Sequence, residues 1–383
     1  MIFFRKIMSK AGVYLHIPFC RSRCSYCDFA TDVYKSSEAV ERYVSALTKE
    51  VEDFQPKESQ ISIDTIYFGG GTPSLLTPKQ LEKILSAIHK KFSVDENSEI
   101  TMEMNPATVM LETLREYKNL GINRASFGAQ TFDDTELKRL GRKHTANDVR
   151  ETIELLRMAD FDNVSFDLIA GLPRQTLADW ERNLGEALQL EPEHLSLYLL
   201  EIHESTPLAE QIRSGRQPLP DEDLAGKMYE LMVEKVCAKG FQQYEISNFS
   251  KPNFVSRHNS KYWLCEPVYA FGVSAHSFDG RARRWANERD TFKYVEMIEK
   301  GNAAVVESGK IDLKSEFVFL GLRLKKGIDV NEYGKRFGVD LLEEYAEDLK
   351  RLKEAQLIEF FNNRLKLTKK GFLFSNEVFA VFV

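Results

Sequence analysis

The chain has 383 residues, of which 43% are hydrophobic, a size that predicts two to three domains with a full core. Its net charge of −6 excludes a strongly basic nucleic-acid-binding protein. The sequence contains no run of 18 or more apolar residues, so no membrane-spanning helix is predicted. Three of its five cysteines fall within eight residues, so a disulfide framework is not expected and the sequence predicts a reducing, cytoplasmic location.

Residues 1–12 are predicted to be an N-terminal extension, too short for a secretory signal, with Met8 as a second candidate start. From residue 13 to 205, strand-like and helical segments alternate. The predicted strands are 13–19, 64–69, 99–104, 123–128, 163–169 and 194–202, and the predicted helices lie near 38–54, 78–92, 110–120, 147–160 and 178–190. Repeated βα units predict an α/β fold with a parallel sheet, either doubly wound or a partial barrel.

Polar residues and glycines follow these strands at the point where each one ends. Cys20 follows the first strand, Gly69 to Pro73 the second and Gln130 the fourth, while Glu103 closes the third and Asp167 lies in the fifth. Active sites of parallel barrels are built at the carboxyl ends of the strands. This placement favours the barrel.

The remaining chain divides into two predicted segments, 206–310 and 311–383. The first contains a helix at 222–239 and a loop-rich stretch with Tyr244 to Asn248 and His258 to Trp263. The second is predicted to form helices at 315–324, 329–337 and 340–355 and a hairpin with strands 357–361 and 364–367, as in a winged-helix module. Its third helix is acidic, which favours a structural or partner-docking role over nucleic-acid binding.

The most informative motif is Cys20-x3-Cys24-x2-Cys27. Three thiolates at this spacing can hold three corners of a cubane iron–sulfur cluster and leave the fourth iron open. A closed zinc site would need a fourth ligand, for which His16 is the only close candidate, and three unrelated buried thiols are the remaining alternative. The spacing favours the cluster.

Together, the cysteine motif and Gly70-Gly71-Thr72-Pro73 resemble those of radical S-adenosylmethionine (SAM) proteins. The resemblance implies a partial (β/α)6 barrel, a [4Fe–4S] cluster whose open iron is chelated by SAM, and cleavage of SAM to a 5′-deoxyadenosyl radical. Carried over position by position, it implies SAM contacts at Tyr14, Gly70, Gly71, Thr72, Glu103, Gln130, Arg142 and Asp167. Their types are suitable, since carboxylates can accept from ribose hydroxyls and arginine can pair with a carboxylate.

Within that superfamily, the run from Tyr14 to Cys20 resembles the oxygen-independent coproporphyrinogen III oxidases and their relatives, the HemW haem chaperones. The oxidases carry a further cysteine two residues after the third, where this chain has Phe29, and a long segment ahead of the cluster. Both differences favour the chaperones. The resemblance then implies a C-terminal domain of the HemN type and delivery of haem to acceptor haemoproteins, including respiratory ones at the membrane surface. The oxidase is the rival enzyme function.

His258-Asn259-Ser260-Lys261-Tyr262-Trp263 is similar to the H-N-x-x-Y-W signature that the chaperone family links to haem. Histidine is a ready axial ligand for haem iron, and tyrosine and tryptophan can cover a porphyrin face. The haem candidates are therefore His258, Tyr262 and Trp263, with Cys265 and His276 as alternative ligands. Without the resemblance, a loop histidine that caps a turn beside two core aromatics explains the motif equally well. Cys237 follows a helical apolar pattern and is predicted to be a core thiol.

Overall fold

The computed structural model describes residues 9–56 and 61–383. Residues 1–8 of the predicted N-terminal extension lie outside the described residues. The first strand begins at Ser9, four residues ahead of the predicted start at 13. The boundaries predicted near residues 205 and 310 stay predictions.

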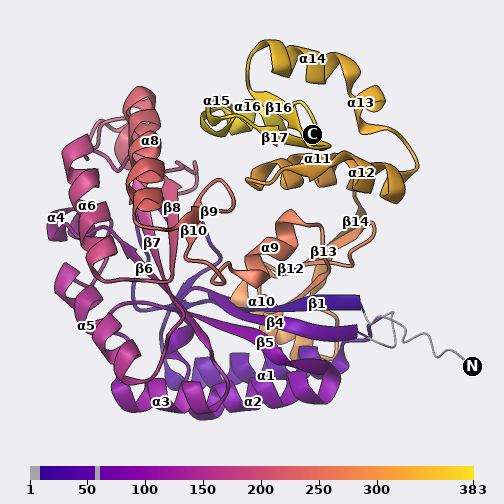
Figure 1. The fold of residues 1–383 in the computed structure, drawn as a ribbon. Helices are drawn as coiled ribbons and strands as arrows, with labels where there is room; N and C mark the ends of the chain where they lie inside the picture. Colours follow the sequence, from indigo (N-terminus) through magenta and orange to yellow (C-terminus); the bar gives the residue numbers. More distant parts are fainter. Residues whose placement is uncertain (1–8, 57–60) are drawn as a thin grey trace, which may run out of the picture.

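Six parallel strands form the centre of the molecule. In spatial order they are β1 (Ser9–Ile17), β4 (Ile61–Gly70), β5 (Ser93–Met104), β6 (Arg124–Gln130), β7 (Val164–Ala170) and β8 (His194–Leu199). The helices that connect them cover the outer face of the curved sheet (Figure 1): α1 (Ser37–Asp53), α2 (Pro78–Lys91), α3 (Leu111–Asn119), α4 (Asp134–Arg139), α5 (Ala146–Met158), α6 (Leu177–Gln189) and α8 (Glu222–Ala238). The predicted partial (β/α)6 barrel is confirmed.

Local sequence accounts for the regularity of these units. β4 is buried on both faces along almost its whole length, as expected for a parallel strand covered by helices. Three of the outer helices begin with a threonine whose hydroxyl accepts from the third helical residue while that residue's side chain accepts from the threonine amide. These reciprocal caps satisfy amides that a helix start leaves without partners.

The sheet continues beyond the barrel on both sides. β11 (Val268–Phe271) pairs in parallel with β1 and is followed outward by β12 (His276–Phe278), β13 (Arg283–Asn287) and β14 (Val305–Lys310). On the other side, β10 (Asn248–Ser250) and β9 (Gln242–Gln243) follow β8. Shorter elements are β2 (Phe19–Cys20), β3 (Asp32–Val33), η1 (Pro73–Leu75), α7 (Pro207–Arg213), α9 (Arg257–Trp263) and α10 (Thr291–Glu299).

The C-terminal residues form a separate group of helices around a small sheet (Figure 1). Its elements are α11 (Leu313–Arg323), β15 (Ile328–Asp329), α12 (Val330–Phe337), α13 (Leu341–Glu344), α14 (Ala346–Glu354), β16 (Ile358–Phe361), β17 (Arg364–Leu367), α15 (Lys369–Leu373) and α16 (Ser375–Phe379). The hairpin lies where it was predicted, with Asn362 and Asn363 both at positive φ, as a two-residue turn of type I′ requires. The single helix predicted over 340–355 is wrong, because Tyr345 leaves helical geometry and separates α13 from α14.

Candidate functional site

The three motif cysteines lie on one loop beyond the carboxyl end of β1, and each is partly exposed. Two polar groups contact their sulfurs: Thr72 Oγ1 lies 3.6 Å from Cys20 Sγ, and Arg142 Nη1 lies 3.6 Å from Cys24 Sγ. Burial raises the pKa of the Cys20 thiol to about 11 and also raises that of Cys27. A bound metal deprotonates a coordinating thiol outright, so these thiols suit a ligand that brings its own positive charge.

Across residues 9–56 and 61–383, no three His, Cys, Asp or Glu side chains are grouped closely enough to hold a metal ion. The assignment of the cysteines therefore rests on their spacing and on the donors that surround the sulfurs. Hydrogen bonds from Thr72 and Arg142 stabilise the thiolate form, and the arginine adds positive charge. These residues fit an anionic, thiolate-bound cluster.

The glycine run at the end of β4 packs directly against the cysteine loop. A Cβ at Gly70, whose φ is +110°, would lie 2.7 Å from the His16 ring, and one at Gly71 would lie 2.6 Å from the Pro18 carbonyl oxygen. Only glycine permits this approach. The Gly71 amide also donates to the Ile17 carbonyl at 2.8 Å, which joins the β1 and β4 loops.

Glu103, at the end of β5, lies beside this run. Its carboxylate accepts from the Tyr67 hydroxyl at 2.7 Å and from the Gly70 amide at 3.1 Å. Burial, with the nearby Asp167 as a further cause, raises the pKa of the Glu103 carboxyl to about 7. A carboxylate can accept about four hydrogen bonds, so capacity remains for the hydroxyls of a ligand.

Arg142, which follows α4, crosses the rim toward the cysteine loop. Its Nη2 donates to Asn105 Oδ1 at 3.0 Å and to the Gly128 carbonyl, whereas its buried Nε has no hydrogen-bond partner among residues 9–56 and 61–383. Asn105 also donates to Thr72 Oγ1 at 2.7 Å. Asn105 therefore holds in place both Thr72 and Arg142, the two residues that contact the cysteine sulfurs. Asn105 was not among the predicted residues, although it directly follows a predicted strand, as the other rim residues do.

The remaining predicted SAM contacts lie on three strands. Gln130 ends β6 with a positive φ of 66°, next to a bulge in its pairing with β7. On β7, burial raises the pKa of the Asp167 carboxyl to about 6. On β1, the Tyr14 hydroxyl lies 3.1 Å from His16 Nδ1, and its ring stacks on that of Tyr67. The structure thus brings all eight predicted SAM contacts to the carboxyl half of the barrel strands.

Arg124, at the start of β6, is a charged residue that sequence reasoning missed. It is only 1% exposed, and its Nε has no hydrogen-bond partner in the part of the chain that the structure describes. The positive charge lowers the pKa values of Asp167 and Glu103, against the larger effect of burial. The signal in the sequence was that Arg124 is the one charged residue of the strand predicted over 123–128, where an uncompensated buried charge is costly.

The haem-linked motif forms α9, and its histidine is fully enclosed. Nδ1 of His258 lies 2.9 Å from Thr65 Oγ1, and Nε2 lies 3.2 Å from the Tyr262 hydroxyl. Burial, followed by the charges of Lys261 and Arg124, lowers the pKa of His258 to about 3. The imidazole is therefore neutral, and both of its nitrogens are engaged.

Further contacts hold α9 in place from both ends. Glu99 accepts from the His258 amide at 2.9 Å, and the buried Lys261 ammonium lies 2.8 Å from Asp64. At the far end, the Arg323 guanidinium of α11 lies 4.2 Å from the centre of the Trp263 ring. The motif thus connects β4, β5 and the C-terminal helices.

The other cysteines and histidines differ in their surroundings. Cys265 is buried and His276 is exposed. The prediction that Cys237 is a core thiol is wrong, because it is exposed. The buried face of α8 contains Met232 and Val236, and the residue after Val236 lies about 100° further around the helix.

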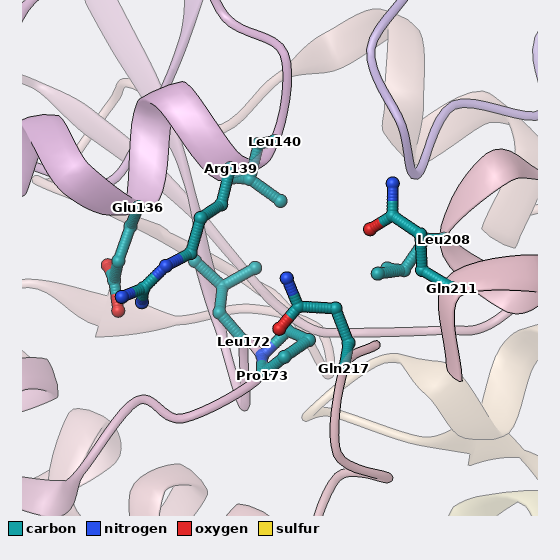
Figure 2. Close-up of a pocket in the computed structure, with 8 residues that line it drawn as sticks. All are labelled: Glu136, Arg139, Leu140, Leu172, Pro173, Leu208, Gln211 and Gln217. Carbon is teal, nitrogen blue, oxygen red and sulfur yellow. The ribbon is translucent and has the colours of Figure 1, made fainter. Parts of the chain in front are cut away.

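A small hollow lies beside α4, away from the cysteines (Figure 2). Its volume is about 10 Å³, which is room for roughly one water molecule. Residues from α4, the loop after β7 and the α7 region line it: Glu136, Arg139, Leu140, Leu172, Pro173, Leu208, Gln211 and Gln217. This hollow is too small for a cofactor.

Residues 14–186 match the Radical SAM superfamily, and residues 310–374 match the HemN C-terminal domain. The chain is 36% identical to the Heme chaperone HemW of Bacillus subtilis, over 97% of this chain and 99% of that one. It is 35% identical to the protein of the same name from Lactococcus lactis, over 97% of each chain. A mouse relative, Radical S-adenosyl methionine domain-containing protein 1, mitochondrial, is 34% identical over 84% of this chain and 74% of its own.

Among solved structures, coproporphyrinogen III oxidase (HemN) from Escherichia coli superposes with a TM-score of 0.85. The match covers 98% of this chain and 90% of that one at 21% sequence identity, so it establishes the shared fold. None of the helices in the described part of the chain is both long enough and apolar enough to cross a membrane.

Proposed function

Since the chain belongs to the radical SAM superfamily and, within it, to the HemW family of haem chaperones, we propose that it binds haem and transfers it to acceptor haemoproteins. The acceptors would include respiratory haemoproteins at the membrane surface, and the protein would work in the cytoplasm. In addition to haem, it would bind a [4Fe–4S] cluster and SAM.

The observation that carries this proposal is the environment of the cysteine loop. Three cysteines lie on one loop, and hydroxyl and guanidinium donors contact two of their sulfurs. The position two residues after the third cysteine is occupied by Phe29, which is 68% exposed. The resembling oxidases have a cysteine there. An exposed phenylalanine beside the cluster loop supports a binding function over the oxidase reaction.

The cofactor contacts are proposed with the function. Cys20, Cys24 and Cys27 would hold the cluster, which when bound supplies an electron and an open iron position. The glycine amides and Thr72 would line the methionyl side of SAM, Arg142 would pair with its carboxylate, and Glu103 would accept from the ribose hydroxyls. These roles match the donors and acceptors that the rim presents.

The motif that the family links to haem suggests that His258 ligates the haem iron and that Tyr262 and Trp263 pack against the porphyrin. In the described conformation both nitrogens of His258 are hydrogen-bonded. Ligation would therefore require the bond with Tyr262 or with Thr65 to open. Cys265 and His276 stay alternative ligands.

The test uses full-length protein with its cluster reconstituted under anaerobic conditions. We expect one haem to bind per chain in a titration followed by Soret absorbance, and to pass to an apo-haemoprotein added afterwards. In parallel, coproporphyrinogen III and SAM should yield no protoporphyrinogen. Formation of protoporphyrinogen without haem binding would favour the oxidase and overturn the chaperone proposal.

A further inference from the structure

A groove of about 500 Å³ lies against the loop that follows the third cysteine. One wall is formed by residues 29–35, and the other by residues 289–295 at the start of α10. Its volume lies within the range of about 300–1,000 Å³ that is usual for ligand pockets. None of the eight proposed SAM contacts, all of which are described, lines this groove.

The lining of the groove is mixed, and its apolar part includes two exposed phenylalanines. Phe29 is 68% exposed and Phe292 is 64% exposed, and both line it together with Val33. Exposed apolar side chains gathered in one hollow are typical of a binding site.

Four cations and two carboxylates also line the groove. Arg42 is paired, because its Nε and Nη2 donate to Glu299 at 2.6 and 2.5 Å. Arg289 donates to the Asp28 carbonyl at 3.0 Å and lies 3.7 Å from its carboxylate. These two cations are therefore largely neutralised.

The other two cations, Arg23 and Lys35, have no ion pair among the described residues. Of the two carboxylates, Asp290 accepts from the Lys293 amide and caps α10, and Asp32 lies on β3. The groove thus combines exposed phenylalanines with two cations outside any ion pair of the described residues, of which Arg23 also acts on the Asp28 carboxyl and the Cys27 thiol.

We propose that this groove is the haem-binding site, with the macrocycle against Phe29 and Phe292 and the propionates toward Arg23 and Lys35. The inference rests on the proposed chaperone function and places its cargo. An apolar ring system with two carboxylates matches the groove in chemistry, and the cations fix its orientation. Haem bound here would contact Phe29, which is only two residues after Cys27. It would therefore lie against the cysteine loop.

This placement differs from the one that the α9 motif suggests. The His258 ring is buried and hydrogen-bonded at both nitrogens, and no residue of α9 lines the groove. Among the described residues that line it, none is histidine, cysteine or methionine. Haem would be held by its ring faces and propionates, which suits a cargo that has to leave.

The test measures haem affinity in anaerobically reconstituted full-length protein. The Phe29→Ala/Phe292→Ala double variant should bind haem at least about tenfold more weakly, which corresponds to about 1.4 kcal/mol. Phe361→Ala, an equally exposed phenylalanine of the C-terminal hairpin, is the matched control and should bind as the parent does. Cluster absorbance should be unchanged in all three proteins, which shows that the fold is intact.

Charge is tested with a second ligand. Lys35→Glu should weaken binding of haem but not of haem dimethyl ester, whose propionates are uncharged, while Lys350→Glu should change neither. Parental haem affinity in both the double phenylalanine variant and Lys35→Glu would overturn the groove assignment. Failure of the parent itself to bind haem would instead overturn the chaperone proposal.

Discussion

The barrel rim and α9 are both singled out by sequence motifs, yet their side chains are in opposite situations. At the rim, the cysteines are partly exposed and the Nε of Arg142 has no hydrogen-bond partner within the described chain. In α9, His258 is enclosed with both nitrogens bonded, and Lys261 is buried in an ion pair. The rim has hydrogen-bonding and ligating capacity left over, whereas on α9 the histidine and lysine have used theirs within the protein, and Nε1 of Trp263 is the one buried side-chain polar atom of that helix that lacks a partner among the described residues.

The difference teaches that a shared motif can mark a support as well as a ligand. The His258 ring stacks on Tyr67 at 5.0 Å between centroids, and Tyr67 donates to Glu103. α9 therefore lies directly behind a residue of the rim. Through this contact it can hold the SAM side of the barrel in position without touching a ligand.

The largest expected effect is at the cysteine loop. Cys24→Ser should abolish the visible absorbance of the reconstituted cluster, because a cubane with two protein thiolates loses one of its three anchors. Far-ultraviolet circular dichroism should stay as in the parent, since Cys24 is partly exposed and lies on a loop. Cys237→Ser, at an exposed thiol on α8, should keep the absorbance. Full absorbance in Cys24→Ser would contradict the assignment of Cys24 as a cluster ligand. The rim would then have no better claim than α9 to be a ligand-binding site.

The second effect concerns Glu103, whose pKa is raised to about 7 by burial. Only the carboxylate accepts from two ribose hydroxyls, so the contribution to SAM affinity is present above the pKa and lost as the pH falls through it. Between pH 8 and pH 6 the ionised fraction of Glu103 falls from roughly nine tenths to one tenth, which should lower SAM affinity about tenfold, and Asp167, with a pKa of about 6, should lower it about a further twofold. Isothermal titration at both pH values measures this.

Glu103→Gln provides the control for that titration. The amide does not titrate, so the pH dependence should shrink to the roughly twofold change that Asp167, with a pKa of about 6, still contributes. A parent whose SAM affinity is the same at pH 6 and pH 8 would show that Glu103 faces the protein only, as the α9 residues do.

The sequence predicted the rim well because parallel strands impose a simple rule. Residues that follow buried strands meet at one end of the barrel, so the strand pattern alone placed Cys20, Glu103, Gln130 and Asp167 together. Hairpin and barrel followed from the same local signals. The break at Tyr345 carried no glycine or proline, so the pattern over 340–355 predicted one helix.

Other features depend on contacts between distant segments, which no local pattern reports. Thr65 and His258 are 193 positions apart, and their bond decides whether the histidine is free to ligate. The groove joins residues near 30 to residues near 290. Arg124 was visible as a lone charge in a strand, but the burial of its Nε without a hydrogen-bond partner among the described residues was not.

The smallest expected effect tests whether His258 is a support. Thr65→Val keeps the shape of the side chain and leaves Nδ1 of the buried imidazole without its partner, which should lower the free energy of unfolding by about 1–3 kcal/mol. Ser165→Ala removes the equivalent hydroxyl from buried His194, where the Oγ–Nδ1 distance is 2.8 Å, and should lower the free energy of unfolding by a similar amount.

If His258 only supports the rim, both variants keep the parental Soret band and haem affinity. A Soret shift in Thr65→Val but not in Ser165→Ala would show that the imidazole reaches haem iron, because only a ligand's tautomer and orientation alter the spectrum. Denaturant unfolding and haem titration of the same two variants therefore separate a supporting histidine from a ligating one.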